Sequence, residues 1–206
     1  MKFEAETRYK ICVSGAAVIK HCSKNIIKLA QNLGEEIAKR DIVLLTGATT
    51  GVPFWAAKGA KKAGGIVVGI SPAASERAHL LKYRLPVKYH DLIIYSGAGY
   101  AGRNLLLTRA ADAVIICCGR MGTLNEFTIA FEDEKPIGVL EGSGGTADKI
   151  REIVKEAHRG PGKIVYSNSP DELIEKVIEL IKKEKQKEEK RLKKLKKLEE
   201  NKKLVI

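Results

Sequence analysis

The stretch that decides the fold runs from Gly102 to Phe127 and reads GRNLLLTRAADAVIICCGRMGTLNEF. Its first part predicts a helix over residues 102–111. The continuously apolar run over 114–118 is typical of a parallel strand that is covered on both faces. A glycine loop follows this strand, and a second helix is predicted from residue 123. This order of elements is that of an α/β protein with a parallel sheet.

The loop between the strand and the second helix has the features of an anion site. Gly119 and Gly122 let the backbone turn tightly and come close to a ligand. Unpaired N–H groups and about half a positive elementary charge lie at the start of the next helix, near Thr123. The Arg120 guanidinium can either hold a phosphate through two hydrogen bonds or extend into solvent. The sequence therefore predicts a phosphate group at residues 119–123.

Two charged side chains flank this loop, Arg103 on the preceding helix and Glu126 on the following one. An arginine at a helix start opposes the helix dipole, which favours a functional reason for it over a surface ion pair. Glu126 has two interpretations. With Thr123 it forms a capping box that only stabilises the helix end; beside a phosphate it is a ligand-binding or catalytic carboxylate. We favour the second because the arginine and the glycine loop accompany it.

Strand and helix patterns alternate along the rest of the chain, which predicts a Rossmann-like three-layer α/β sandwich with a mostly parallel sheet. Ligands of such sheets bind outside the carboxyl ends of the strands. The stretch 71–88 breaks the alternation and contains His79; both an active-site loop and a plain surface connection fit it. Strands are expected at residues 9–14, 42–46, 66–70, 92–95, 113–118, 136–140 and 164–166. Helices are expected at residues 24–39, 53–63, 102–111, 123–133 and 147–157 and from Pro170 onward.

These motifs resemble those of the LOG family. Residues 118–126, CGRMGTLNE, correspond to the family hallmark Pro-Gly-Gly-x-Gly-Thr-x-x-Glu, and Arg103-Asn104 corresponds to an Arg-Lys pair on the preceding helix. The segments ICVSGA at 11–16, with Gly15, and LLTGATTG at 44–51, with Gly47, resemble the first two strands and their loops. The resemblance covers about residues 8–181. Its departures, which include Cys118 for Pro, Arg120 for Gly and Asn104 for Lys, indicate a divergent branch.

The resemblance implies a function as well as a fold, because characterised LOG proteins are nucleoside 5′-monophosphate phosphoribohydrolases. They hydrolyse the N-glycosidic bond to release the base and ribose 5-phosphate. Glu126 would stabilise the positive charge that develops on the sugar and hold the water, and Arg103 would orient Glu126 and stabilise the departing base. The resemblance implies no metal and no cofactor, and it implies that two copies of the chain form a homodimer. The nucleotide and its phosphate would be held by Gly15, Gly47, Gly119, Arg120, Gly122 and Thr123.

Two other classes of function remain open. Related folds serve as non-catalytic carriers of a phosphorylated ligand, such as molybdenum cofactor or a nucleotide, and a phosphate site suits either. The other class is a nucleic-acid-associated protein that acts through a basic tail. Released ribose 5-phosphate would support the enzyme, a retained intact ligand the carrier, and steep salt dependence of DNA or RNA binding the third class.

The composition of the chain indicates one hydrophobic core and a cellular compartment. The chain has 206 residues, of which 44% are hydrophobic, enough for one core. It has no secretory signal pattern and no apolar run near 18 residues, so we expect a cytoplasmic protein with no membrane partner. The four cysteines show no Cys-x-x-Cys spacing and no histidine at ligand spacing. The four are Cys12, Cys22, Cys117 and Cys118. Cys12, Cys117 and Cys118 fall in or at the end of predicted strands, so we interpret these three as small apolar core residues in a reducing compartment.

The C-terminus differs in composition from the rest. From Lys182 to Ile206 there are 12 Lys and Arg against 5 acidic residues, so this segment holds seven of the twelve net positive charges. We divide the chain into a nucleotide-binding domain, 1–183, and a Lys/Glu-rich helical tail, 184–206. Leu192, Leu195 and Leu198 give the tail a narrow apolar stripe. A solvated helical extension is favoured over a nucleic-acid arm, because the tail lacks interleaved aromatic residues.

Overall fold

A computed structural model describes the backbone of residues 8–203 and the side chains of residues 8–196. Seven strands form one sheet in the order β4-β3-β2-β1-β5-β6-β7. Every pair of neighbouring strands in it is parallel. The predicted Rossmann-like sandwich is confirmed, and each strand lies within one residue of its predicted bounds. The strands are β1 Lys10–Gly15, β2 Val43–Thr46, β3 Val67–Ser71, β4 Leu92–Tyr95, β5 Ala113–Cys117, β6 Ile137–Leu140 and β7 Ile164–Ser167.

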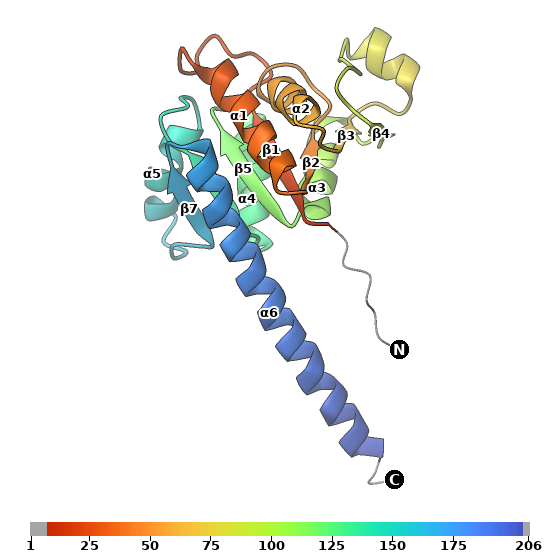
Figure 1. Cartoon of the computed structure of the whole chain (residues 1–206), viewed down its shortest axis with the longest axis vertical. Coiled ribbons are helices and arrows are strands. Elements are labelled where there is room, and N and C mark those ends of the chain that lie inside the picture. The colour runs from red at the N-terminus through yellow and green to blue at the C-terminus, as the bar shows by residue number, and fades with distance from the viewer. Residues whose placement is uncertain (1–7, 204–206) are drawn as a thin grey trace.

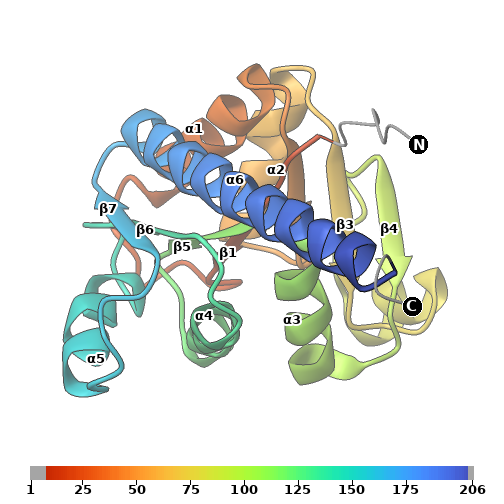
Figure 2. The same ribbon diagram turned by 90° about the horizontal axis from the view of Figure 1, so that it is seen from below.

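Helices cover both faces of this sheet. Helices α1, α2 and α6 lie on one face and α3, α4 and α5 on the other, as Figures 1 and 2 show from two directions. The first turn of α5 follows a 3₁₀ turn at Ala147–Lys149, which accounts for the earlier start predicted for that helix. The helices are α1 Ile26–Lys39, α2 Val52–Lys62, α3 Gly99–Ala110, α4 Met121–Glu132, α5 Ile150–Glu156 and α6 Pro170–Lys203.

The core has two layers because successive side chains of a strand point to opposite faces. In β1, Ile11 and Val13 pack with α1, α2 and α6, whereas Cys12 between them packs beneath α3 and α4. All five residues of β5 are buried. This central position fixes the carboxyl ends of β1 and β5 side by side, since Gly15 pairs with Cys117.

The stretch 71–88 forms a π-helical turn at Ala78–Lys82 rather than an open loop. His79 is fully buried there; one ring nitrogen lies 2.8 Å from Ser71 Oγ and the other 3.1 Å from the carbonyl oxygen of Pro86. The histidine thus joins both ends of the segment. These contacts favour the interpretation as a structural connection.

The interpretation of the cysteines as reduced core residues is wrong for Cys118. Cys12 and Cys117 are free buried thiols, but Cys118 forms a disulfide with Cys22. These two residues are separated by 96 positions, and only the fold brings them together: their Cα atoms are 5.7 Å apart. A sequence without a short cysteine motif gives no signal for such a pair.

Helix α6 continues without a break across the predicted boundary at 183/184 (Figure 1). Among residues 170–196, whose side chains the structure describes, every buried side chain precedes that boundary, and Leu192 and Leu195 are about half exposed. The side chain of Leu198 lies outside the described residues. Among the helices that the structure describes, none has the length and apolarity needed to cross a membrane. The buried residues of α6 among the described side chains are Pro170, Leu173, Ile174, Val177 and Ile181.

Removing the tail after Lys183 should leave the fold and ligand binding nearly unchanged. The cut removes the two partly exposed ion pairs that join the described part of the tail to the rest of the chain, Lys163–Glu184 at 2.5 Å and Lys185–Asp112 at 3.2 Å. Such pairs stabilise by about 0–1 kcal/mol each, so we expect the melting temperature to fall by only a few degrees. Calorimetry measures this fall, with a chain cut after Arg191, which keeps both pairs, as the control.

The same two shortened chains test the tail's other interpretations. If the tail binds a nucleic-acid duplex, each phosphate contact should contribute about 0.9 to the slope of log affinity against log salt concentration. This slope should become less steep when the tail is removed. Unfolding of the chain cut after Lys183, or a lower oligomeric mass in light scattering, would instead make the tail part of the scaffold.

Candidate phosphate-binding site

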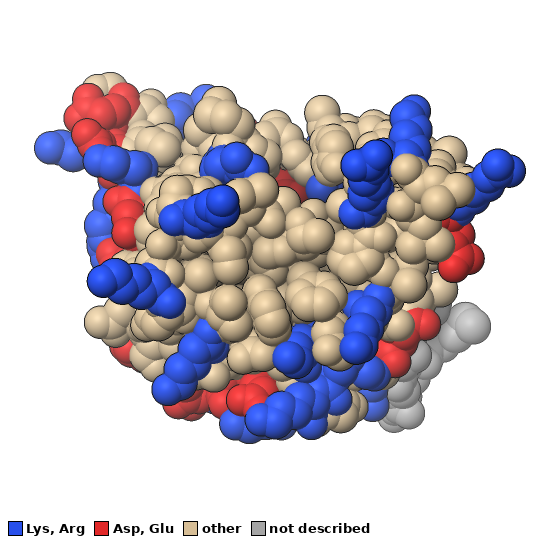
Figure 3. All heavy atoms as spheres, turned by 90° about the horizontal axis from the view of Figure 1, so that it is seen from above, with Lys and Arg blue, Asp and Glu red and all other residues tan. Residues whose placement is uncertain are grey.

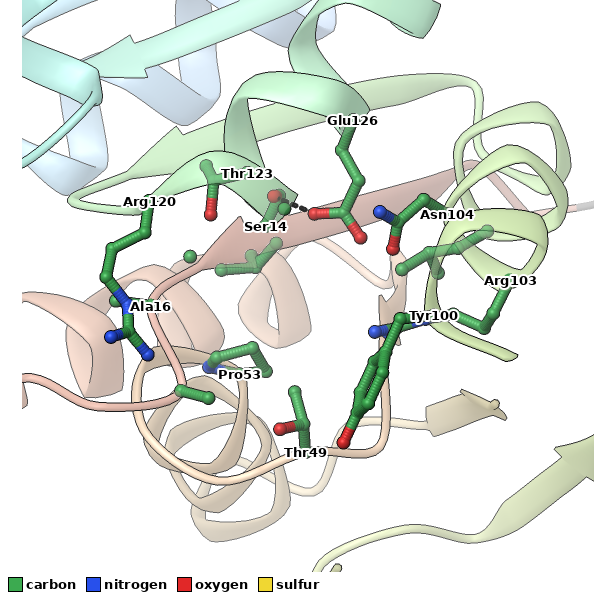
Figure 4. A pocket seen from close by; sticks show the side chains of 16 residues that line it. Ser14, Ala16, Thr49, Pro53, Tyr100, Arg103, Asn104, Arg120, Thr123 and Glu126 are labelled. Atoms are coloured by element: carbon green, nitrogen blue, oxygen red, sulfur yellow. Dashed lines mark hydrogen bonds between the residues drawn. The ribbon is translucent and has the colours of Figure 1, made fainter. Parts of the chain in front are cut away.

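A cavity of about 300 Å³ opens at the carboxyl ends of β1 and β5. Residues from four regions of the chain converge there: the turn after β1, the loop after β2, helix α3, and the start of α4 (Figure 4). In a parallel sheet this is the place where helix N-termini and loops meet a ligand. The cavity is lined by Val13, Ser14, Gly15, Ala16, Ala17, Gly47, Thr49, Pro53, Tyr100, Arg103, Asn104, Leu107, Arg120, Gly122, Thr123 and Glu126.

Glu126 is the acidic residue of this lining and is almost fully buried. Its carboxylate accepts a hydrogen bond from the Ser14 hydroxyl, drawn as the dashed line in Figure 4. The capping-box interpretation is wrong, because α4 begins at Met121 and Arg120 is its N-cap, with no side-chain capping bond. Thr123 and Glu126 therefore lie inside the helix, and the carboxylate is directed to β1 instead of to the helix end.

Burial raises the pKa of Glu126, because the charged form loses its hydration. The positive charge of Arg103 and the hydrogen bond from Ser14 act in the opposite direction and lower that pKa. A carboxyl whose pKa is raised by burial beside a cavity is a candidate for taking up and releasing a proton during a reaction.

Arg103 reaches the cavity from the second turn of α3 and is buried. Its guanidinium lies directly over Gly47: a Cβ added to that glycine would be 1.5 Å from Arg103 Nη1. The guanidinium therefore occupies the space that a side chain at residue 47 would fill. Among the described residues, Arg103 Nε has no hydrogen-bond partner. A buried N–H without a partner is costly, so this atom fits an acceptor oxygen supplied by a ligand.

The sequence analysis assigned no role in the site to several lining residues, among them Asn104 and Tyr100. Asn104, which stands where the family has a lysine, lies within α3. The amide orientation that satisfies both its nitrogen and its oxygen donates to Glu126 Oε1 at 3.0 Å. Tyr100 is half exposed at the rim, with its ring centroid 5.9 Å from Arg103 Cζ. Only the helical spacing of residues 100, 103, 104 and 107 signals this shared face.

The predicted phosphate residues separate into two groups. Arg120, Gly122 and Thr123 line the cavity at the first turn of α4, and Gly15 lines it at the end of β1. Gly119 does not line it. Gly119 has a φ of 105°, which favours glycine, and its carbonyl oxygen accepts from Thr146 N–H at 3.1 Å. This glycine shapes the loop behind Arg120, and its predicted contact with a phosphate is untested.

Basic side chains surround the site. Figure 3 views the end of the molecule at which the strands have their carboxyl ends, and Lys and Arg stand around its margin while its centre is mostly uncharged. Such an arrangement attracts anions towards the centre. Arg120 extends over the cavity in Figure 4, on the side opposite Arg103. The site therefore presents one buried cation, Arg103, one exposed cation, Arg120, and a helix N-terminus to the same space.

The chain belongs to the SLOG cluster 4 family, whose model matches residues 8–174. This membership confirms the resemblance to LOG proteins. An uncharacterised protein from Archaeoglobus fulgidus is 31% identical over 132 residues, which are 64% of this chain and 82% of that protein.

Solved structures of similar proteins give the same fold. The molybdenum cofactor binding protein of Rippkaea orientalis is 30% identical, with a TM-score of 0.67 over 87% of this chain and 98% of that one. The molybdenum cofactor carrier protein of Chlamydomonas reinhardtii is 26% identical, with a TM-score of 0.68 over 84% of this chain and 99% of that one.

Proposed function

We propose that this chain binds a small phosphorylated ligand in the cavity between β1, α3 and α4 and acts as its carrier. The observation that carries the proposal is the buried Arg103 Nε without a partner, in a cavity that also contains the first turn of α4. An anionic oxygen supplies the missing acceptor, and the helix N-terminus favours its charge. The similar molybdenum cofactor proteins support a phosphorylated pterin or a nucleotide as the ligand.

Arg120→Ala should weaken binding of a phosphorylated probe by about tenfold or more, the scale of one charge-assisted hydrogen bond. Adenosine 5′-monophosphate and inorganic phosphate are the probes, titrated calorimetrically into the full chain. Arg109→Ala is the matched control, because Arg109 is an exposed arginine of α3 that pairs with Asp133 outside the cavity. Native mass spectrometry of the purified chain identifies any retained ligand.

Three results decide the proposal. Equal affinities of Arg120→Ala and the unmodified chain would contradict the placement of the phosphate at α4. Retained intact ligand with no turnover supports the carrier. Release of ribose 5-phosphate from a nucleotide would contradict the carrier proposal and show that the chain is an enzyme.

Hydrolysis of a nucleoside 5′-monophosphate is the second candidate, and Glu126 favours it. Cleavage of the N-glycosidic bond places positive charge on the ribose, and a carboxylate oriented beforehand stabilises that charge. Ser14 and Asn104 hold the two oxygens of Glu126 from opposite sides. A pure carrier has no need for a buried carboxyl whose pKa burial raises.

We also propose that the chain forms a homodimer and acts in the cytoplasm. Tyr100, Leu106 and Met121 are exposed apolar residues of α3 and α4, and exposed apolar groups of this size mark interfaces. A second copy seated there would border the cavity, since Tyr100 lines its rim. The mass measured by light scattering for the full chain tests this, and a monomer at micromolar concentration would contradict it.

A further inference from the structure

The disulfide lies beside the loop that carries Arg120. Cys118 ends the buried strand region and directly precedes Gly119 and Arg120, and Cys22 ends the segment that begins with the cavity residues Ala16 and Ala17. The bond therefore joins two segments that both line the cavity. Neither the carrier nor the hydrolytic function uses it.

The backbone at Cys118 is held in an unusual conformation. Its φ is 55°, in the left-handed region that residues other than glycine rarely adopt. Proline, which the family hallmark has at this position, is fixed near −65° and cannot take this conformation. The loop of this chain thus begins differently from one with the hallmark sequence, and the disulfide is the feature that replaces the proline.

A third segment holds the two cysteines together independently of the bond. Ser143 is fully buried; its carbonyl oxygen accepts from Ser23 N–H at 3.0 Å, and its hydroxyl accepts from Cys118 N–H at 2.8 Å. The next residue, Gly144, forms an isolated bridge with Cys22. These contacts do not depend on the sulfur atoms. After reduction the two thiols would therefore stay adjacent and could pair again.

The two sulfur atoms differ in their surroundings. Cys22 is partly exposed, whereas Cys118 is fully buried. The exposed His21 places Nε2 3.6 Å from Cys118 Sγ and 3.2 Å from the Gly119 carbonyl oxygen. A ring N–H at this distance can donate a hydrogen bond to a thiolate on Cys118, which makes Cys118 the better leaving group. The accessible sulfur for attack is that of Cys22.

We propose that Cys22 and Cys118 form a reversible thiol–disulfide modification site, with small thiols and disulfides as reactants, that controls how firmly the Arg120 loop is held. An external thiolate attacks Cys22 Sγ, the protein S–S bond breaks, and Cys118 leaves with the electron pair as a thiolate. A second thiol molecule then releases Cys22, so two thiols become one small disulfide and the protein gains two thiols. The effect on ligand binding rests on the proposed function; the exchange does not.

The direction of attack is tested with single variants treated with glutathione disulfide and followed by intact-protein mass spectrometry. Cys118→Ser should take up one glutathione at Cys22, and Cys22→Ser should react at least about tenfold more slowly, because its remaining sulfur is buried. Cys12 and Cys117 are buried in both chains, and burial raises the pKa of Cys117 to about 12, so they contribute little background. Equal rates in the folded variants, or no adduct on either, would overturn the proposal; urea-unfolded samples should react equally.

The role of His21 is tested by the rate at which dithiothreitol reduces the bond. His21→Ala should slow reduction by about fivefold, whereas His158→Ala, an exposed histidine on another segment, should not. An unchanged rate would remove His21 from the mechanism. Sγ of both cysteines and a His21 ring nitrogen lie within 4.8 Å of one another, a distance that also suits a metal. The proposal would be overturned in favour of a metal site if the reduced chain bound one Zn²⁺ and did not react with glutathione disulfide until a chelator removed the metal.

The link to the cavity is tested with adenosine 5′-monophosphate titrated into oxidised and reduced chains. The reduced chain should bind about fivefold more weakly, because it must order the loop on binding. Cys22→Ser/Cys118→Ser should show the weaker affinity under both conditions. Equal affinities of the oxidised and reduced chains would overturn the link. If neither form binds the nucleotide, the proposed function fails, while the exchange experiments still decide the chemistry of the site.

Discussion

Replacing Glu126 with glutamine is expected to lower any hydrolysis of a nucleoside 5′-monophosphate by at least about a hundredfold, the scale of a positioned acid–base group. Glutamine keeps the size of the side chain and an oxygen that accepts from Ser14, so the cavity should keep its shape. It removes the negative charge that would stabilise the sugar. Ribose 5-phosphate release measures the effect, with Thr128→Ala, an exposed residue of α4 outside the cavity lining, as the control.

The same variant should bind a phosphorylated ligand at least as tightly, because a negative charge is removed from a cavity that receives an anion. Strong binding with unchanged turnover would contradict a catalytic role for Glu126. Weaker binding would show that the carboxylate holds the ligand instead, for example through a hydroxyl group.

Glu126→Gln should also stabilise the fold, with a defined pH dependence. Burial raises the pKa of Glu126, so the folded chain binds this proton more tightly than the unfolded chain. Unfolding then releases a proton between the carboxyl's ordinary pKa and its raised pKa, and the free energy of unfolding falls as pH rises through that window. The variant avoids this loss, so its advantage grows above pH about 4.5, the ordinary pKa, and disappears below it. Turnover of the native chain should rise with pH over the same window.

The fold was predictable from the sequence because its signals are local. A buried parallel strand such as β5 is a run of apolar residues, and each helix has its own 3.6-residue pattern. Pro170 marks the first turn of α6 in the same way. Helix starts were less certain: α3 begins three residues before its predicted start, and α4 begins two residues early because Met121 and Gly122, which read as loop residues, belong to the helix.

The site was predictable only in part, because its key contacts join distant segments. Arg103 and Glu126 were found because they flank the glycine loop in the sequence. The partner of Glu126 is Ser14, 112 residues away, and the resemblance that assigned its orientation to Arg103 gave no hint of this. A capping box and a buried carboxylate share one sequence pattern, and only the true start of α4 separates them. The pairing of Cys22 with Cys118 depends in the same way on the neighbouring loop at Ser143.

Gly47→Ala is expected to remove most of the contribution of Arg103 to the site. The added methyl carbon would be 1.5 Å from Nη1 and 2.7 Å from Cζ of the arginine, so the guanidinium must leave its position. Because the displaced atoms are the end of a side chain and not backbone, the fold should survive. Binding of adenosine 5′-monophosphate should weaken by about tenfold or more, the scale of one charge-assisted hydrogen bond.

Two further variants make this result specific. Gly122→Ala is a control for the stability of the fold alone, because a Cβ at that position meets no protein atom within 4 Å although Gly122 lines the same cavity. Combining Gly47→Ala with Arg103→Ala should bind no more weakly than Arg103→Ala alone, since both changes remove the same guanidinium from the same place. Additive losses in the double variant would mean that Gly47 contacts the ligand by itself, as the sequence analysis predicted. An unchanged affinity of Gly47→Ala would mean that Arg103 acts from a different position, and the unpaired Nε would lose its assigned role.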